Sequence, residues 1–588
     1  MRRSPLLIVL ASTALAMSAC GGGGSSSQPP PQADTKNVND SPGQFEGGPQ
    51  GPVTIPGARK GGIVTVLTQT GLTTSIDPAD AYYLDTISID SNLITRSLTQ
   101  YRYDPKTEQM VLVPDLATDL GRHNDDYTKW QFTIRKGVKF EDGSRVTAKN
   151  IAWGIQRCMD TATFPTGPCQ YYANAYFRGG SSYKGPYTAP RQKFDAVSVK
   201  GDRLTITLDH PFPDMAYWGT FPAMGPVPLG KASDPATYKN HPLATGPYMV
   251  KSYSPAKELV LERNPSWDPK TDPGRTAYPD GYDFKTQQQP EKTDQILLAD
   301  TGSGQTTLTY DNLLAPDYQQ LVAKDPDRLT LGGVPCTFYW APDNRKITDQ
   351  RVREALSWAY PYKDAILAGG DIPGVTALPG NNLMPPGIPG RKAYDVTGRD
   401  AFETDPARAH ALLEQAGAVG YDIRFLFRAD DPSSVKVKDA VVKALTTAGF
   451  KATPVPTTIA DYVADRGKTT SDLNVRSASW CSDWPSGSTW IPTVYADTKP
   501  DQTGSLGGDY AAFHEPAVQS KVAAIDKLPL DQQPAAWNAL DRLVMRRYFP
   551  LFPTYYGGEA MAHGSQIQGM ADDPTTGMPT WKQIWVDQ

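Results

Sequence analysis

Segments with the residue alternation of β-strands and segments with the spacing of amphipathic helices follow one another irregularly along this chain. Apolar and polar residues alternate at 63–68, 130–134 and 204–208, which predicts strands there. Helical patterns begin after residues typical of N-caps, namely Thr147, Asp349 and Asp405. The sequence contains no internal repeat. This mixture predicts α/β lobes with long excursions rather than a barrel or a solenoid.

The overall composition narrows the class of protein. At roughly 100–200 residues per domain, 588 residues allow three or four domains. A net charge of −5 lacks the basic excess of a nucleic-acid-binding protein, so no nucleic acid is expected as a partner. Beyond the N-terminus, no apolar run approaches the ~18 residues of a membrane span. The bulk of the chain is therefore expected to be globular.

The first twenty residues have the features of an export signal. A basic head is followed by a short apolar stretch, by small residues and by Cys20. This order resembles the lipobox of bacterial lipoproteins, whose cysteine is acylated, for example with palmitate, and becomes the mature N-terminus. We expect a lipoprotein signal peptide at 1–20, a lipidated Cys20 as membrane anchor, and a flexible tether at 21–57. The alternative is an ordinary signal peptide cut near Ala19. Either way, the protein is expected on the extracytoplasmic side of a bacterial cell membrane.

The five cysteines fit an exported protein. Without Cys20, four remain, and they can pair in three ways. An oxidising compartment favours disulfides. Cys158 and Cys169 enclose a loop with Pro and Gly and are able to close it locally, in which case Cys336 and Cys481 join distant segments. A zinc site is the competing interpretation, but no Cys-x-x-Cys motif or close pair of histidines supports it.

Motifs for catalysis or cofactor binding are scarce. The sequence has no Gly-x-Ser-x-Gly nucleophile elbow and no phosphate-binding glycine loop before a helix. None of its six histidines falls in His-x-His or His-Glu-x-x-His spacing. The sequence thus predicts no catalytic residue, no metal site and no cofactor, which favours a binding protein over an enzyme.

Several segments resemble, in the same order, the family 5 solute-binding proteins of bacterial ABC importers, the oligopeptide and dipeptide group. These segments are VPDLA at 113–117, WQFTIRKGVKFEDG at 130–143, TGPY at 245–248, LERNP at 261–265, DQRVREAL at 349–356 and EQAG at 414–417. Because they are collinear, the resemblance extends over essentially all of residues 60–588. It implies a two-lobe periplasmic-binding-protein-like fold (type II, cluster C) with an extra domain inserted in lobe I.

The resemblance also implies the borders of these domains. Lobe I is expected to be discontinuous, because the chain crosses between the lobes more than once. Its parts are expected at 58–84, 226–335 and 557–588. The inserted domain is expected at 85–225 and lobe II at 336–556.

One segment of the resemblance concerns the ligand. The run SWCSDW at 479–484 is similar to the segment of oligopeptide-binding proteins that carries the acid for the peptide's α-ammonium group. Carried over, that acid is Asp483. A charge-assisted hydrogen bond from this carboxylate would offset much of the cost of enclosing the ammonium group. Without the resemblance, Asp483 would be interpreted as a solvated turn residue.

A second segment selects among the cysteine pairings. The run PCTFY at 335–339 is similar to the family segment whose cysteine bridges to the cysteine just before the acid. The resemblance therefore implies a disulfide between Cys336 and Cys481, which leaves Cys158 and Cys169 for the other. Such a bridge would hold the backbone two residues from Asp483.

The resemblance further implies contacts to the rest of a peptide. Two backbone edges would flank an extended ligand, one from Leu72, Thr73 and Thr74 and one from Ser479, Trp480 and Cys481. Arg428 stands where dipeptide binders keep an arginine for the ligand carboxylate, and Arg476 is the runner-up. Surface pairing with neighbouring acids is the alternative for Arg428. Cleft lining and core packing are equally open for the tryptophans Trp480, Trp484 and Trp490.

Together, these features predict a monomeric protein that captures di- or oligopeptides and delivers them to the permease of an ABC importer. No bond of the ligand would change. The same fold also serves nickel chelates, oligosaccharides and opines, so another solute is the alternative within the family. A surface-anchored hydrolase and a peptide sensor are the alternatives from other classes.

Overall fold

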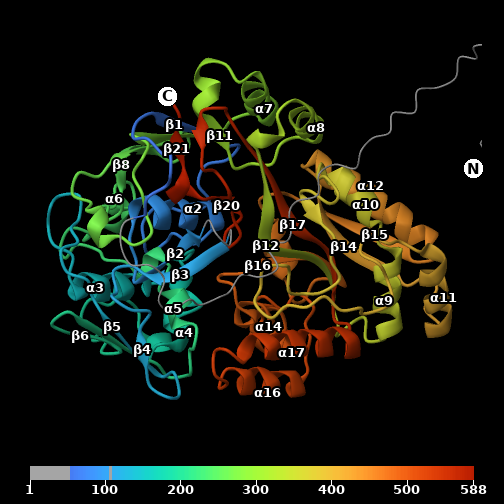
Figure 1. The fold of residues 1–588 in the computed structure, drawn as a ribbon. Coiled ribbons are helices and arrows are strands. Elements are labelled where there is room, and N and C mark those ends of the chain that lie inside the picture. Colours follow the sequence, from blue (N-terminus) through green and yellow to red (C-terminus); the bar gives the residue numbers. More distant parts are fainter. Residues whose placement is uncertain (1–52, 105–108) are drawn as a thin grey trace, which may run out of the picture.

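The computed structural model describes residues 53–104 and 109–588. The predicted signal peptide at 1–20, the lipidated Cys20 and nearly all of the predicted tether at 21–57 lie outside these residues. In the described part, helices and strands alternate irregularly around several sheets, so the predicted α/β class is confirmed (Figure 1). No helix there combines the length and apolar character needed to cross a membrane.

A nine-stranded sheet runs through the middle of the molecule (Figure 1). Its order is β16 (Val475–Cys481), β12 (Leu329–Pro342), β17 (Phe552–His563), β11 (Thr307–Thr309), β1 (Ile63–Leu67), β10 (Gly281–Lys285), β9 (Glu258–Arg263) and β8 (Tyr248–Ser254), with β13 (Ala377–Leu378) also on β17. β1 is parallel to β10 and β11, and β16 is antiparallel to β12. The pairing of β12 with β17 shifts in register between Gly333 and Thr337. β16 pairs with the second half of β12, from Cys336 to Pro342.

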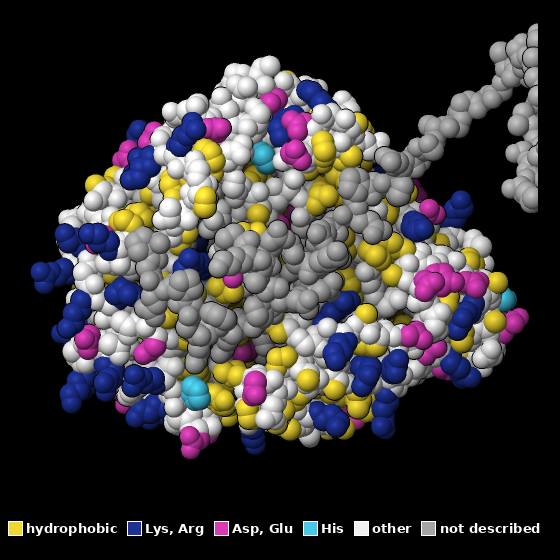
Figure 2. Space-filling model, in the orientation of Figure 1, with side chains coloured by type: hydrophobic (Ala, Val, Ile, Leu, Met, Phe, Trp, Pro, Cys, Tyr) yellow, Lys and Arg dark blue, Asp and Glu magenta, His cyan; other side chains and the backbone are white. Residues whose placement is uncertain are grey.

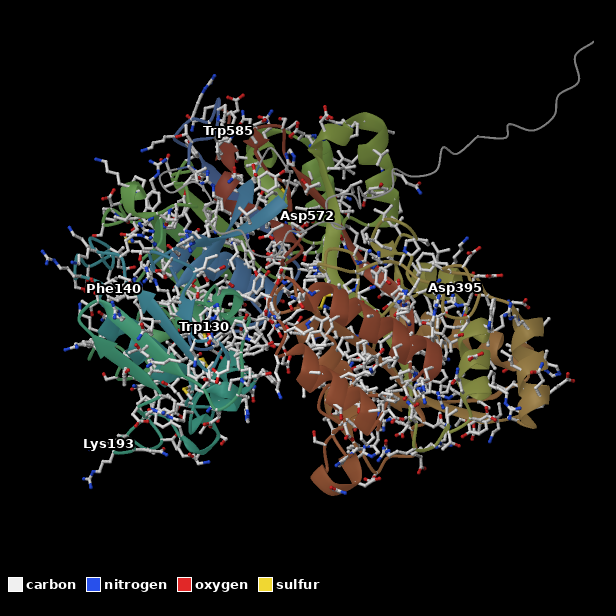
Figure 3. The ribbon with its side chains drawn as sticks, turned by 60° about the horizontal axis from the view of Figure 1, so that its bottom comes forward. Trp130, Phe140, Lys193, Asp395, Asp572 and Trp585 are labelled. Carbon is white, nitrogen blue, oxygen red and sulfur yellow. A yellow bond between two sulfur atoms is a disulfide. The ribbon has the colours of Figure 1, made fainter. Side chains whose placement is uncertain are left out.

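Residues 99–224 surround a smaller antiparallel sheet. Its strands are β4 (Arg122–His123), β5 (Lys129–Thr133), β7 (Arg203–Thr207) and β6 (Val197–Lys200), accompanied by α3 (Ala148–Cys158) and the hairpin of β2 (Thr99–Asp104) and β3 (Gln109–Pro114). Thr147 and Asn150 form a capping box at the start of α3, as the position of Thr147 predicts. Trp130 and Phe140 are buried in this part, whereas Lys193 lies at its outer end (Figure 3).

The opposite side of the molecule is built from residues 343–551 (Figure 1). It contains α9 (Gln350–Ala359), α10 (Tyr362–Gly369), α11 (Pro406–Ala416), α12 (Pro432–Thr447), the parallel pair β14 (Asp422–Arg428) and β15 (Lys451–Thr457), α13 (Tyr462–Gly467), α14 (Ile491–Val494), α15 (Pro500–Thr503), α16 (Pro516–Ile525) and α17 (Gln533–Arg547). Asp349 and Asp405 accept backbone N–H groups at the starts of α9 and α11, which confirms both predicted caps.

The other helices and strands link these parts or lie near the C-terminus. They are α2 (Leu84–Ile89), α4 (Ala173–Tyr176), α5 (Met215–Trp218), α6 (Pro235–Tyr238), α7 (Pro290–Ala299), α8 (Ala315–Lys324), β18 (Ile567–Gln568), β19 (Asp572–Asp573), β20 (Met578–Pro579) and β21 (Trp585–Val586). The backbone N–H of Gly333 in β12 donates to Asp572 at 3.3 Å. The C-terminal segment therefore returns to the central sheet, where Asp572 is marked in Figure 3.

Buried apolar side chains form several clusters rather than one core. One cluster consists of residues between 79 and 224 together with one distant residue, Trp484. A second cluster combines residues from 64–94, 244–308 and 567–586. Others lie between residues 339 and 552. The side chains of each cluster are in contact with one another. The borders predicted for the lobes stay predictions.

A buried network of charges ties the second of these clusters to the β2–β3 hairpin. Asp115 pairs with Arg96 at 2.8 Å and with Arg275 at 2.7 Å, and Arg275 also meets Asp272 at 3.2 Å. All four side chains have no exposed surface. Buried charges are tolerated only when paired in this way. By contrast, Lys and Arg are scattered among Asp and Glu on the face shown in Figure 2.

Candidate ligand-binding site

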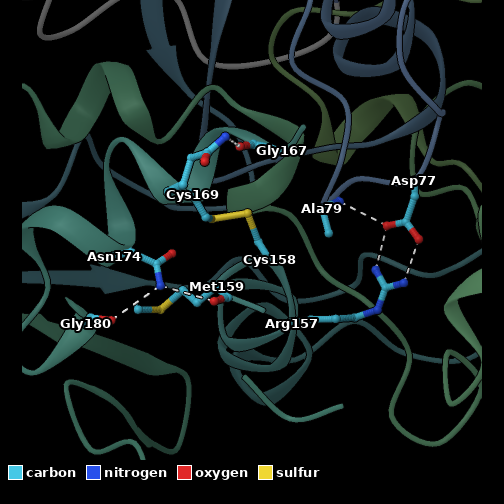
Figure 4. Close-up of a disulfide and its surroundings, with 10 residues drawn as sticks. Asp77, Ala79, Arg157, Cys158, Met159, Gly167, Cys169, Asn174 and Gly180 are labelled. Atoms are coloured by element: carbon cyan, nitrogen blue, oxygen red, sulfur yellow. Dashed lines mark hydrogen bonds and ion pairs between the residues drawn. A yellow bond between two sulfur atoms is a disulfide. The ribbon is translucent and has the colours of Figure 1, made fainter. Parts of the chain in front are cut away.

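Both predicted disulfides are present. Cys336 of β12 and Cys481 of β16 lie opposite each other in the strand pairing and are joined, 145 residues apart in sequence. Cys158 and Cys169 close a loop of 11 residues, near the bidentate ion pair of Arg157 and Asp77 (Figure 4). The pairing taken from the family resemblance is confirmed.

The larger loop makes the Cys336–Cys481 bridge the more important one for stability. In the chain-entropy model, a disulfide stabilises more when it closes a longer loop. The disulfide that closes the 145-residue loop is therefore expected to add about 2 kcal/mol more to the free energy of unfolding than the one that closes the 11-residue loop. We expect replacement of Cys336 and Cys481 by Ser to lower the free energy of unfolding by about 2–4 kcal/mol. Urea denaturation measures this, with Cys158→Ser/Cys169→Ser as the matched control. Equal losses in both pairs would contradict the expectation.

Asp483 lies two residues beyond β16, in a pocket between distant parts of the chain. The same pocket is lined by Tyr82 and Gln100 and by Asp573 and Lys582 of the C-terminal segment. The carboxylate accepts hydrogen bonds from the hydroxyls of Tyr172 and Tyr82. Burial raises the pKa of Asp483 to about 6, although both hydroxyls favour its charged form. The site therefore contains a desolvated acid whose present partners are neutral.

Trp484 fixes the position of its neighbour Asp483. Its indole ring is 2% exposed and lies 4.7 Å from the Tyr172 ring and 6.1 Å from the Phe221 ring, between ring centroids. Its N–H donates to Asp214 at 3.1 Å. Trp484 thus belongs to the core formed by residues 79–224 and does not line an open cleft.

The two other tryptophans also have packing roles. The indole N–H of Trp480 donates to the carbonyl of Thr489 at 2.7 Å. Trp490 is fully buried in the cluster that includes Val544 of α17. Trp484 and Trp490 therefore occupy core positions, whereas Trp480 is half-buried at the edge of the cluster of Trp490, and its place in the cleft stays a prediction.

β16 has a free edge that faces away from β12. The carbonyl of Ser477 accepts from the Tyr462 hydroxyl at 3.1 Å and from Arg466 at 3.3 Å, whereas the N–H of Ser482 donates to the carbonyl of Pro335 in β12 at 2.8 Å. Backbone groups of alternate residues in a strand point to opposite sides. The N–H and C=O groups of Ser479 and Cys481 therefore point to the same free edge as those of Ser477.

The predicted edge at Leu72, Thr73 and Thr74 is partly occupied. The N–H of Thr73 donates to Asp85 at 2.9 Å, and the N–H of Thr74 donates to the Thr86 hydroxyl at 3.2 Å. Leu72 is half-buried against the cluster that includes Val64. The N–H groups of Thr73 and Thr74 are thus already bonded to side chains at the start of α2. A peptide would bind here through the carbonyl groups of this edge, or after these two hydrogen bonds break.

The two candidate arginines have different surroundings. Arg428, at the end of β14, lines a pocket of about 420 Å³ together with Ser479, and its side chain is 41% exposed and pairs with Asp431 at 2.6 Å. Arg476 is fully buried and pairs with Asp343 at 3.0 Å. Only Arg428 of the two therefore faces a space that a ligand is able to enter.

The residues that the sequence analysis missed are Tyr82, Tyr172, Asp573 and Lys582. Tyr172 lies 311 residues from Asp483 in the chain. The pairs Tyr82–Tyr83 and Tyr171–Tyr172 stand out as aromatic doublets, but spacing alone does not connect them to residue 483. Only the tertiary structure brings these groups together.

Comparison with known proteins places the chain in a family. The family model "Bacterial extracellular solute-binding proteins, family 5 Middle" matches residues 111–502, two thirds of the chain. The periplasmic oligopeptide-binding protein OppA of Salmonella typhimurium is 24% identical over 458 residues, covering 74% of this chain and 77% of OppA. The periplasmic murein peptide-binding protein MppA of Escherichia coli is 24% identical over 497 residues, covering 82% of this chain and 85% of MppA.

Solved structures agree with this assignment. Clavulanic acid biosynthesis oligopeptide binding protein 2 superposes with a TM-score of 0.80 at 23% identity, covering 90% of this chain and 96% of that one. The unliganded open form of MppA superposes with a TM-score of 0.68 at 21% identity, covering 92% and 99%. The predicted two-lobe fold of periplasmic binding proteins is therefore confirmed. The chain belongs to the bacterial extracellular solute-binding proteins of family 5.

Proposed function

We propose that this protein captures peptides with a free amino terminus outside the cell membrane and delivers them to the permease of an ABC importer. The observation that carries the proposal is a half-buried carboxylate with a raised pKa, Asp483, held beside the free edge of β16. Relatives named as oligopeptide-binding, murein peptide-binding and D,D-dipeptide-binding proteins support it. The ligand is released unchanged.

The chemistry at the amino end follows from the surroundings of Asp483. Its two hydroxyl partners are neutral, so an ammonium group brings the first full positive charge to it. A charge-assisted hydrogen bond is about twice as strong as a neutral one, and this carboxylate is already half-buried before the ligand binds. The neighbouring disulfide and the anchored ring of Trp484 hold the acid in place before the ligand arrives.

The peptide backbone would add to the sheet at β16. The outward-facing backbone of Ser479 and of Cys481 offers one N–H donor and one C=O acceptor each. These groups bind the backbone of a peptide and do not depend on its side chains. Arg428 would bind the ligand carboxylate in the pocket beside Ser479, after loosening its bond to Asp431. These contacts to the backbone and to the two ends do not read the internal side chains, which suits a binder that accepts many internal sequences.

Capture would be coupled to closure of two lobes. We propose lobe I from 58–84, 226–335 and 557–588, the inserted domain from 85–225 and lobe II from 336–556. A ligand that contacts both lobes stabilises the closed state, because those contacts are absent when the lobes are apart. In the same proposal the protein is a monomer, anchored to the membrane through lipidated Cys20.

Calorimetry with alanine peptides of two to five residues tests this function. We expect at least one length to bind, and the N-acetylated peptide of that length to bind at least 30-fold more weakly. Equal binding of acetylated and free peptides would contradict the role of Asp483. A failure of every length to bind would overturn peptide capture, and recovery of cleaved peptide would favour a hydrolase.

Acidic pH should weaken peptide binding. The pKa of Asp483 is raised to about 6, so its ionised fraction falls from about nine tenths at pH 7 to about one tenth at pH 5. The peptide amino group stays protonated over this range. We expect calorimetry to show an affinity about tenfold lower at pH 5 than at pH 7. An affinity that rises or stays constant would contradict the assignment.

A further inference from the structure

A second pocket, separate from that of Asp483, is large and has several aromatic side chains in its walls. We call it the aromatic pocket; its volume is about 420 Å³, and its walls include Phe338, Tyr360, Phe425, Phe427, Tyr462 and Tyr555. The rings of Phe338 and Tyr555 are stacked with centroids 4.4 Å apart. A cavity of about 150 Å³ already encloses a benzene ring. The aromatic pocket therefore has room for a bulky side chain together with part of a peptide backbone.

Positive charges lie at the walls of the aromatic pocket. Arg466 stands 5.4 Å from the Tyr462 ring centroid, and the Lys438 ammonium stands 5.3 Å from that of Phe427. Arg428 lies 5.9 Å from the Tyr462 ring centroid. One acid, Asp371, also lines the pocket, but it accepts a hydrogen bond from the Thr376 hydroxyl, and burial raises its pKa. Arg428 and Lys438 are paired with Asp431 and Asp439, which lie outside the lining, so cations outnumber the acid at the pocket wall itself. The lining thus favours an aromatic ring or a carboxylate, and its cations repel a further cation.

The position of the pocket determines which part of a peptide enters it. Ser477 and Ser479 of β16 form one wall, and Arg428 forms another. Asp483, which would hold the amino end, lies two residues beyond the C-terminal end of the strand, in a different pocket. A ligand carboxylate at Arg428 therefore brings the side chain of the last residue into the aromatic pocket.

We propose that the aromatic pocket selects peptides whose carboxyl-terminal residue is aromatic and rejects those that end in Lys or Arg. This inference rests on the proposed capture of peptides and names the class of peptide. The selectivity comes from burial of the ring among aromatic walls and from repulsion between the three cations and a basic side chain.

Calorimetry on the full mature chain tests the preference. The reference ligand is the alanine peptide that binds, and the test ligands carry Phe or Lys as the last residue or Phe as the first. We expect carboxyl-terminal Phe to tighten binding at least tenfold, carboxyl-terminal Lys to weaken it, and amino-terminal Phe to bring no comparable gain. Equal affinity for terminal Phe and Ala overturns the selectivity while peptide capture stands. No binding of any peptide overturns capture itself.

A variant that fills the pocket locates the effect. Val437 lines the aromatic pocket from α12, and Val435 lies on the same helix outside the lining. We expect Val437→Trp to abolish the preference for terminal Phe and Val435→Trp to keep it. Persistence of the preference in Val437→Trp would overturn the proposal. Thermal denaturation shows whether each of these two variants is folded. Phe427→Ala enlarges the same pocket, and we expect the preference for terminal Phe to fall in this variant as well.

Discussion

Replacing Asp483 by Asn is expected to weaken peptide binding by about 2–5 kcal/mol, which is on the order of 30- to several thousand-fold. Asn keeps the size of the side chain and is able to accept from Tyr172 and Tyr82, so the fold should persist. What is lost is the negative charge that balances the ligand's ammonium group at a half-buried site. Isothermal titration calorimetry with the alanine peptide that binds measures the difference.

Two controls make this result specific. Asp472 lies in the same half of the chain, is 87% exposed and meets Arg424 at 3.8 Å, so Asp472→Asn should leave affinity within about twofold. An N-acetylated peptide carries no ammonium group, so it should bind the native protein and Asp483→Asn about equally. Unchanged affinity for the free peptide in Asp483→Asn would remove Asp483 from the site.

The largest expected effect on stability comes from Asp115. Its carboxylate accepts from Arg96 at 2.8 Å and from Arg275 at 2.7 Å, and none of the three side chains is exposed. Asp115→Ala leaves two buried guanidinium groups with Asp272 as their remaining acid. Breaking a buried ion pair on one side typically costs about 3–5 kcal/mol, because the partner charge stays desolvated. We expect urea denaturation to show a loss of this size.

The same stretch of chain offers a matched control. Asp119 pairs with Arg122 at 3.8 Å, and the Arg122 side chain is 85% exposed. Removing an exposed pair of this kind changes stability by about 1 kcal/mol or less. A loss in Asp115→Ala no larger than that in Asp119→Ala would show that the network does not hold this part of the fold together.

Much of the fold was predictable because its signals are local. Alternation identified β1, β5 and β7, and short polar residues before apolar periods identified the starts of α3, α9 and α11. These patterns depend on neighbours a few residues apart, so the order of residues is enough to read them. The Cys336–Cys481 bridge came from resemblance to a family, because four cysteines by themselves allow three pairings.

The surroundings of the candidate residues were not predictable in the same way. Arg428 and Arg476 were both candidates for the ligand carboxylate, yet one faces a pocket and the other is buried against Asp343. From the sequence, Trp484 was equally compatible with lining the cleft and with packing in a core. The structure places it in a core formed by residues more than 250 positions earlier in the chain. Such outcomes depend on which surfaces meet after folding.

The order of residues was enough to predict the α/β class, the starts of α3, α9 and α11 and the family, and it pointed to Asp483, whose role stays a prediction. Only the tertiary structure decided that Tyr172 and Tyr82 enclose that acid, that the odd-numbered residues at the end of β16 face a free edge, and that aromatic rings from several elements form one pocket beside Arg428. The physical reason is the range of the interactions: caps and strand alternation act within a few residues, whereas burial, desolvation and ring packing join segments that are hundreds of residues apart.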